Sequence, residues 1–365
     1  MEDRKLRVAI THGDTNGIGY ELIFKTFAEP EMLELCTPIV YGSPKVAAYH
    51  RKALEMQANF SIINSAEEAR DGRVNLLTCF EDEVKVELGT PTTESGQAAL
   101  KALDRAMTDF RSGLFDVLVA CPVCKDNAKS EEYAYTGLKE YLETSIGEGK
   151  KGIRIMLNEA IRISTATDCM ALKNVSGCIT EENIAEKIKA LHESMKRDFR
   201  LSNPRIAVLA LNPDADGTEE AQVLSPTVGK LADDGINVYG PYPTNEFFGK
   251  ELFDAFDCTL AMYDDQALIP FNTLMQESGI VYIAGLPLVC TAPATTPCFE
   301  DAGKGTADEN MLRHAIYCAI DVFRHRNEYD EPLANPLQKL YHEKRDESEK
   351  VRFAIPKKRP AAPNK

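Results

Sequence analysis

The stretch LRVAITHGDTNGIGYELIFKTFA (residues 6–28) places a strand, a tight turn and a helix one after another. Its first six residues form an apolar run of the kind that is buried in a sheet. Gly13, Gly17 and Gly19 allow the turn that follows, and YELIFKTFA continues as a helix. A strand that leads directly into a helix is the unit from which α/β proteins are built.

The alternation of strands and helices continues along the chain. An amphipathic helix is predicted at 94–113, and another at 179–199 begins with Thr180 in the N-cap position. Buried strands are predicted at 38–42, 115–122, 153–157, 205–213, 258–263 and 279–285. This order predicts an α/β fold in which a mostly parallel sheet carries helices on both faces.

The composition narrows the class of protein. With 365 residues, of which 44% are hydrophobic and 27% charged, the chain is expected to form two globular domains. It has no apolar run long enough for a membrane span and no N-terminal signal pattern, which predicts a cytoplasmic protein without a membrane partner. The formal net charge of −15 argues against a nucleic-acid partner, which would require clustered cations.

The ten cysteines are scattered singly except in CPVC, which contains Cys121 and Cys124. No second CxxC completes a zinc site, so most cysteines are expected to be reduced thiols. CPVC lies at the carboxyl end of a predicted strand beside Lys125. It is either a reactive part of a site or a packed turn.

Four polar loops directly follow predicted strands, and ligands of such sheets bind beyond the carboxyl ends of strands. The loops are THGDTNGIG, CPVCKDN, NPDADG and DDQ. The first can present backbone N–H groups to an anion, although its spacing departs from the dinucleotide-binding fingerprint and a plain turn is the alternative. In NPDADG, Asp216 fits a helix cap, whereas Asp214 is either a cap or a ligand-binding residue.

Asp264 and Asp265 follow the apolar run CTLAMY. Buried carboxylates at a strand end require a nearby cation, lysine or substrate hydroxyl. Successive strand residues point to opposite faces, so the two aspartates are expected to serve different sites. Cys169 stands alone after ISTAT, and a lone cysteine is more typical of a core than of a ligand site.

In order and spacing, these loops resemble the 4-hydroxythreonine-4-phosphate dehydrogenase family of the isocitrate and isopropylmalate dehydrogenase superfamily. The resemblance covers roughly residues 6 to 328 and leaves 331–365 outside, where charge runs and prolines predict an appendage with a mobile, basic end and one weak helix at 336–350. It is carried by ITHGDTNGIGYE, LNPDADG, GPYPTNEFF, MYDDQAL, GLPLVCTAP and EDAGKGTAD.

The resemblance implies a two-domain isocitrate/isopropylmalate dehydrogenase-like fold with a cleft between the domains. It assigns residues 1–130 with 300–330 to a first domain, and residues 131–299 to a second domain that makes dimer contacts. It also implies a homodimer whose site is shared between the subunits.

The implied activity is oxidation and decarboxylation of 4-phosphohydroxy-L-threonine to 3-amino-2-oxopropyl phosphate, on the route to pyridoxal phosphate. The implied cofactors are NAD or NADP and a divalent metal (Zn, Mg or Mn), which acts as a Lewis acid. At the three metal-binding histidines of the family, this chain has Cys169, Asp214 and Asp264, all of residue types that bind divalent ions. Asp265 and Lys125 are the predicted catalytic residues.

The resemblance also implies positions that contact the substrate and the nucleotide. The substrate positions are Leu138, Lys139, Asn272, Val281 and Cys290, and the cofactor positions are Gly13, Asp14, Thr295, Thr296 and Phe299. Because charged phosphate donors are replaced, a related hydroxy acid without phosphate is an alternative substrate. A non-catalytic binding protein is the other alternative, since the nucleotide-side segment differs from the family at residues 295–298.

Overall fold

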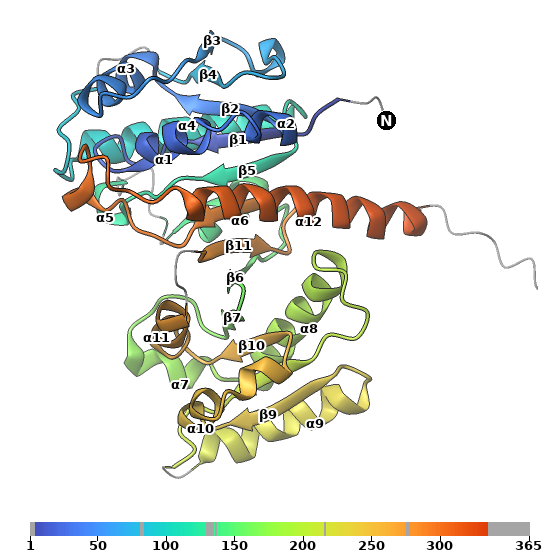
Figure 1. Cartoon of the computed structure of the whole chain (residues 1–365). Helices are drawn as coiled ribbons and strands as arrows, with labels where there is room; N and C mark the ends of the chain where they lie inside the picture. The colour runs from blue at the N-terminus through green and yellow to red at the C-terminus, as the bar shows by residue number, and fades with distance from the viewer. Residues whose placement is uncertain are drawn as a thin grey trace, which may run out of the picture.

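The computed structural model describes residues 4–80, 84–128, 135, 137–214, 217–274 and 278–334. Within these residues, twelve strands form one sheet in the order β3-β4-β2-β1-β5-β12-β11-β6-β7-β10-β8-β9 (Figure 1). The strands are β1 (Arg7–Thr11), β2 (Thr37–Gly42), β3 (Ser61–Ile63), β4 (Asn75–Thr78), β5 (Val117–Ala120), β6 (Ile153–Leu157), β7 (Arg162–Thr165), β8 (Ile206–Leu209), β9 (Val238–Tyr242), β10 (Cys258–Ala261), β11 (Ile280–Ala284) and β12 (Val289–Pro293).

Helices cover this sheet. They are α1 (Gly19–Thr26), α2 (Met32–Leu35), α3 (Pro44–Ala53), α4 (Thr93–Arg111), α5 (Lys125–Ala128), α6 (Leu138–Ile146), α7 (Val175–Cys178), α8 (Glu181–Arg197), α9 (Ser225–Asp233), α10 (Thr244–Gly249), α11 (Asp264–Leu274) and α12 (Asn310–Ala334). Short helical turns are η1 (Ala66–Glu68), η2 (Leu172–Asn174), η3 (Glu220–Leu224), η4 (Leu252–Ala255) and η5 (Phe299–Asp301).

Most neighbouring strands are parallel. The exceptions lie at the centre, where β11 is antiparallel to both β12 and β6, and β6 is antiparallel to β7. Parallel strands are buried on both faces by the helices that connect them, and β1, β5, β8 and β10 are almost wholly buried. The predicted α/β fold with a mostly parallel sheet is confirmed.

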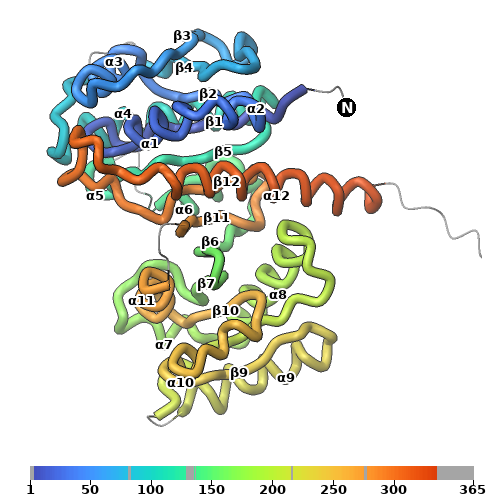
Figure 2. Tube along the Cα trace, in the orientation of Figure 1, coloured from blue at the N-terminus to red at the C-terminus, as the bar shows by residue number. Residues whose placement is uncertain are grey.

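The central antiparallel strands join two halves, and α12 crosses the molecule where they meet (Figure 2). One half contains β1 to β5 and β12, and the other contains β7 to β10. The predicted domain ranges put α6 and β12 in the second domain. In the structure β12 pairs with β5, and Tyr141 and Leu142 of α6 share a core with Leu118 of β5. The chain therefore crosses between the halves more often than those ranges imply.

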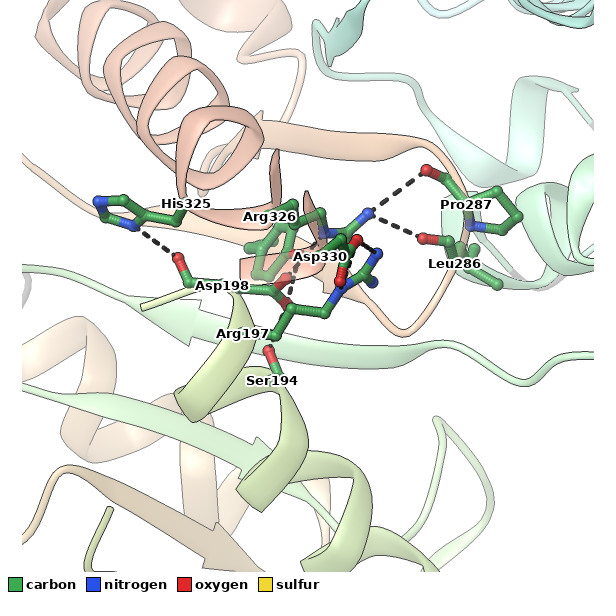
Figure 3. Close-up of polar contacts among 9 residues, drawn as sticks. Ser194, Arg197, Asp198, Leu286, Pro287, His325, Arg326 and Asp330 are labelled. Atoms are coloured by element: carbon green, nitrogen blue, oxygen red, sulfur yellow. Dashed lines mark hydrogen bonds and ion pairs between the residues drawn. The ribbon is translucent and has the colours of Figure 1, made fainter. Parts of the chain in front are cut away.

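A buried polar cluster ties α12 to α8 at this junction (Figure 3). The Asp198 carboxylate, at the end of α8, accepts hydrogen bonds at 2.7 Å from Arg326 Nε and from the Tyr282 hydroxyl. Arg326 Nη2 donates to Tyr282 Oη at 2.7 Å, and Nη1 donates to the Leu286 carbonyl at 2.9 Å. We call Asp198, Tyr282 and Arg326 the junction anchor.

Of the local predictions, one is confirmed, one is wrong, and two concern residues outside the described ones. Thr180 caps α8, with its hydroxyl accepting the Asn183 N–H at 3.2 Å, as predicted. The alternation expected of Asp264 and Asp265 is wrong, because β10 ends at Ala261 and both aspartates lie in the first turn of α11. Helix dipoles favour acidic residues in a first turn, which gives this pair a structural role. The predicted cap Asp216 and the weak helix at 336–350 lie outside the described residues.

Candidate active site

A cavity of about 560 Å³ opens where strands of the two halves end. Thr11 and Ala120, the last residues of β1 and β5, line it together with Asp168 and Cys169, which follow β7. Its apolar wall includes Leu100, Leu103, Val281 and Ile283. A cavity of this volume, which combines an apolar wall with charged side chains that include Glu140, Glu143 and Asp168, is suited to a small molecule.

Three cations line this cavity in a strongly acidic chain: Lys125, Lys139 and Arg154. Lys125 begins α5, and its ammonium group lies against the backbone of Gly137. Lys139 lies in the first turn of α6, whose first residue, Leu138, also lines the cavity. The predicted residues Lys125, Leu138, Lys139 and Val281 are therefore brought together.

Lys139 is held between two carboxylates. Its Nζ lies 3.0 Å from Glu143 Oε1 and 3.2 Å from Asp168 Oδ2. Burial acts to lower the pKa of this ammonium group, but the hydrogen bonds and charges of Glu143 and Asp168 raise the pKa above its usual value. Lys139 therefore carries a full charge at the cavity wall.

Lys187 of α8, which sequence reasoning missed, belongs to the same electrostatic cluster. Burial lowers the pKa of its ammonium group, and the charge of Lys139 lowers it further, while Asp168 acts in the opposite direction. In sequence, Lys187 is one of several charged residues on an amphipathic helix, so no signal set it apart.

Arg154, also missed, contributes the third cation of the cavity. It lies on β6 opposite Ile283 of β11, and its guanidinium pairs with the Asp264 carboxylate. The available signal was a single arginine inside the apolar strand IRIML. Charged residues are seldom buried unless they are paired, so an arginine in an apolar strand indicates a partner.

The predicted metal residues are not gathered within one chain. Among the described residues, no group of three or more histidine, cysteine, aspartate or glutamate side chains could hold a metal ion. Cys169 and Asp214 are both exposed, and only Cys169 lines the cavity. Asp264 is paired with Arg154, and Asp265 is exposed on the first turn of α11.

Gln266, the third residue of the DDQ motif, has a structural role. Its buried side-chain amide accepts the Met262 N–H at 2.6 Å and donates to the Ala210 carbonyl and the Thr244 hydroxyl, at 2.7 and 2.6 Å. These bonds join the loops that follow β8, β9 and β10. The residue fixes where α11 begins and hence where Asp264 lies.

Two predicted substrate positions lie away from the cavity. Cys290, on β12, is completely buried in the core, where burial raises the pKa of its thiol. A buried, protonated thiol offers no contact to a ligand in this cavity. Asn272 is exposed on α11 and is not part of the cavity wall.

The glycine-rich loop after β1 is a packed turn. Asp14 N–H donates to the Pro122 carbonyl at 2.9 Å, Asn16 N–H to Asp14 Oδ1 at 3.0 Å, and Ile18 N–H to the Pro297 carbonyl at 3.1 Å. Gly13 has a φ of +74°, and a Cβ there would lie 2.5 Å from the Pro122 carbonyl oxygen. These amides are thus used within the protein. The same contacts pack CPVC against the loop, and Cys121, Pro122 and Val123 also line the cavity.

The segment at 295–299 packs against this loop, so the predicted cofactor positions are neighbours despite their distance in sequence. Thr295 lines the cavity, Thr296 is exposed, and Phe299 begins η5. The Thr295 and Thr296 hydroxyls lie 3.3 and 3.5 Å from the Cys298 sulfur. Of the two threonines, Thr295 lines the cavity and Thr296 does not.

Comparisons with known proteins place this site in a family. A family model described as "Pyridoxal phosphate biosynthetic protein PdxA" matches residues 34–319. A 4-hydroxythreonine-4-phosphate dehydrogenase of Bacteroides thetaiotaomicron is 48% identical over 358 residues, which cover 97% of this chain and 98% of the relative. One of Prosthecochloris aestuarii is 31% identical, covering 86% of this chain and 96% of the relative.

Solved structures agree in fold. A 4-hydroxythreonine-4-phosphate dehydrogenase of Klebsiella pneumoniae matches with a TM-score of 0.75 at 23% identity, covering 88% of this chain and 99% of that one. By its fold and its curated relatives, the chain is an α/β dehydrogenase. The chain belongs to the family of PdxA pyridoxal phosphate biosynthetic proteins and is an oxidoreductase of that kind.

These findings bear on two further predictions, namely how far along the chain the resemblance extends and whether the chain has a membrane span. The match to the Bacteroides relative covers 97% of this chain, and the uncovered part is shorter than the segment 331–365. The resemblance therefore extends into the C-terminal segment. The first residues of that segment end α12, and residues from 335 onward lie outside the described part. No helix among the described residues is long and apolar enough to cross a membrane.

Proposed function

We propose that the chain oxidises 4-phosphohydroxy-L-threonine with NAD or NADP and releases carbon dioxide, giving 3-amino-2-oxopropyl phosphate for pyridoxal phosphate biosynthesis. The observation that carries this proposal is the 48% identity to the Bacteroides relative over 97% of the chain. The cavity supports it, because cations there can receive an anionic substrate.

The reaction balances without a further oxidant. A hydride leaves the carbon that bears the 3-hydroxyl and the hydroxyl proton is lost. The resulting 3-oxo acid breaks its bond to the carboxylate carbon, and the enolate is protonated. When bound, the nicotinamide would accept the hydride, and Thr295 is the residue of the predicted cofactor segment that would contact it from the cavity wall. Lys125 and Lys139 bind and orient the anionic groups of the substrate.

The predicted divalent metal does not fit the described residues of one chain. Cys169, Asp214 and Asp264 are of suitable chemistry, but Asp264 already has the Arg154 guanidinium as its counter-ion. A second cation at this carboxylate would be repelled by the first. We therefore assign no step to a metal ion.

The test is to mix purified protein with 4-phosphohydroxy-L-threonine and NAD or NADP and to follow reduced nicotinamide and carbon dioxide. Equal amounts of both products support the proposal, whereas reduction without carbon dioxide contradicts the decarboxylation. The Lys139→Met variant should lose activity, and Lys189→Met, which removes an exposed lysine of α8 outside the cavity wall, is its matched control. We also propose a homodimer, which sedimentation would test.

A hydroxy acid without phosphate is the second candidate substrate. The position of Cys290 in the core and of Asn272 outside the cavity favours it, because neither residue brings a donor to a phosphate within one chain. The same assay with 4-hydroxy-L-threonine separates the two substrates. Turnover of the phosphorylated compound alone would reject the second candidate.

A further inference from the structure

Arg154 is placed and held in a way that the proposed reaction does not yet use. It stands on the central strand β6, where both halves of the sheet meet, and its side chain is 27% exposed at the cavity wall. Asp264, 22% exposed, reaches it from the first turn of α11. The two residues are 110 positions apart in sequence, so their pairing depends on the arrangement of the sheet.

The guanidinium is only partly used. Its Nη2 donates to Asp264, and this is the one hydrogen bond that the guanidinium makes to the described residues. A guanidinium has five donors in a planar fork that matches a carboxylate or a phosphate. A half-buried fork with free donors at a cavity wall has the chemistry to receive an anionic group of a ligand.

Asp264 is occupied by the same interaction. A divalent ion bound to this carboxylate would lie within a few ångströms of the guanidinium, because metal–oxygen bonds are about 2.0 to 2.6 Å long. Two neighbouring cations in a partly buried site repel strongly. The carboxylate can thus neutralise the arginine or bind a metal, and the geometry favours the arginine.

We propose that Arg154 is the built-in cation of this site: Asp264 holds its guanidinium in place of a divalent ion, and the free donors bind a carboxylate or phosphate group of the ligand. The inference rests on the proposed function only for the identity of that ligand. Arg154 is then a specificity-determining residue, and the site works without a bound metal.

The first measurement is the divalent metal content of the purified protein by elemental analysis, before and after loading with Zn, Mg or Mn. We expect no stoichiometric ion in either case. A stoichiometric ion that is lost in the Asp264→Asn variant would overturn the proposal. Such a result would also be expected if a dimer completed a site from Cys169, Asp214 and Asp264.

The second measurement is binding by calorimetry in the presence of a chelator, with inorganic phosphate, 4-hydroxy-L-threonine and 4-phosphohydroxy-L-threonine as separate probes. Binding of the first probe alone identifies a phosphate subsite, and binding of the second identifies a carboxylate subsite. The Arg154→Gln variant should weaken binding of the responding probe by roughly 10- to 100-fold, the loss of one or two charge-assisted hydrogen bonds.

Matched variants separate this role from folding. Arg205→Gln removes an arginine that also pairs with an aspartate, Asp257, but at an exposed position away from the cavity. It should leave binding unchanged. Arg154→Lys keeps the positive charge but not the planar fork, and should retain part of the anion binding even if Arg154→Gln is too unstable to study. Equal affinity in wild type and Arg154→Gln, or binding that requires a metal, would each contradict the proposal.

Failure of the reaction itself would be recognised separately. If anion binding depends on Arg154 but no nicotinamide is reduced, the inference about Arg154 stands and the proposed reaction fails. If nicotinamide is reduced only after metal is added, the reaction stands and the inference fails.

Discussion

Two arginine–aspartate pairs in this protein differ in how completely their donors are used. In the junction anchor, Arg326 and Asp198 are 5% and 3% exposed, and each nitrogen of the guanidinium donates to an acceptor. At the cavity wall, Arg154 and its partner Asp264 are several times more exposed, and one guanidinium nitrogen is used. The first arrangement is complete within the chain, whereas the second is complete only with a ligand.

The difference follows from desolvation. A fully buried ion pair recovers the cost of leaving water only when every donor and acceptor is satisfied, and the junction anchor meets that condition with the Tyr282 hydroxyl and the Leu286 carbonyl. Arg154 retains contact with solvent, so its free donors cost little until a ligand replaces water. A complete pair therefore stabilises the fold, and an incomplete pair is suited to recognition.

The strongest way to break this comparison is Asp198→Ala. It would leave Arg326 buried without its counter-ion, and we expect a loss of about 3 to 5 kcal/mol in the free energy of unfolding. Urea unfolding measures it. Asp330→Ala is the control, because Asp330 pairs with Arg197 where the side chains are 46% and 32% exposed, and its loss should cost about 1 kcal/mol. Equal losses in the two variants would contradict the distinction.

Two buried histidines are a further case, because no acidic group contributes to the shift of their pKa values. Burial lowers the pKa of His12 to about 4, and that of His50 likewise to about 4. Between this value and the ordinary value of 6.5, the unfolded chain binds more protons than the folded chain, so stability falls as the pH falls.

From about pH 7 to about pH 5, each histidine should cost about 2 kcal/mol of unfolding free energy. Urea unfolding at both pH values measures this loss, and His12→Gln should reduce it by about one histidine's share. Stability that stays constant over this range would show that the two rings are not held neutral in the folded protein.

The fold was predictable from sequence to the extent that it depends on local patterns. The apolar runs and amphipathic segments predict the parallel strands and the long helices, and Thr180 marks the start of α8. The antiparallel centre was not predictable, since the period of a strand does not determine its direction. β6, read correctly as 153–157, gives no sign that both of its neighbours run against it.

The site was predictable in part for a related reason. The order of the motifs in the sequence predicts Lys139, Cys169 and Thr295 as site residues, and all three line the cavity. Arg154 was missed because its partner is distant in sequence, and the family resemblance that assigns Asp264 to a metal gives no sign of its pairing with Arg154. Cys290 was matched by position in a motif, but burial depends on the packing of β12.

A sharper test of the cavity side is Lys139→Met. The Lys139 and Glu143 side chains remain 18% and 20% exposed, so removing the lysine should cost less stability than Asp198→Ala, which acts on an almost completely buried pair. The affinity for an anionic ligand should fall roughly 10-fold, as expected for one charge-assisted hydrogen bond. Thermal unfolding and calorimetry measure the two effects. A large loss of stability would contradict this expectation and show that Lys139, like the junction anchor, stabilises the fold.

The smallest expected effect concerns two thiols of the cavity wall that differ in burial. Cys169 is exposed, whereas Cys121 is buried and burial raises the pKa of its thiol to about 12. A thiol reagent should therefore modify Cys169 readily and Cys121 only when the protein unfolds, because the thiolate is the reactive form. Stability should hardly change on modification of Cys169.

Peptide mass analysis after brief labelling identifies the modified residue, and a bound substrate should slow its modification. Protection of Cys169 by substrate but not by an unrelated hydroxy acid would link this thiol to ligand binding, whereas equal labelling with and without substrate would mean that the ligand leaves this wall uncovered.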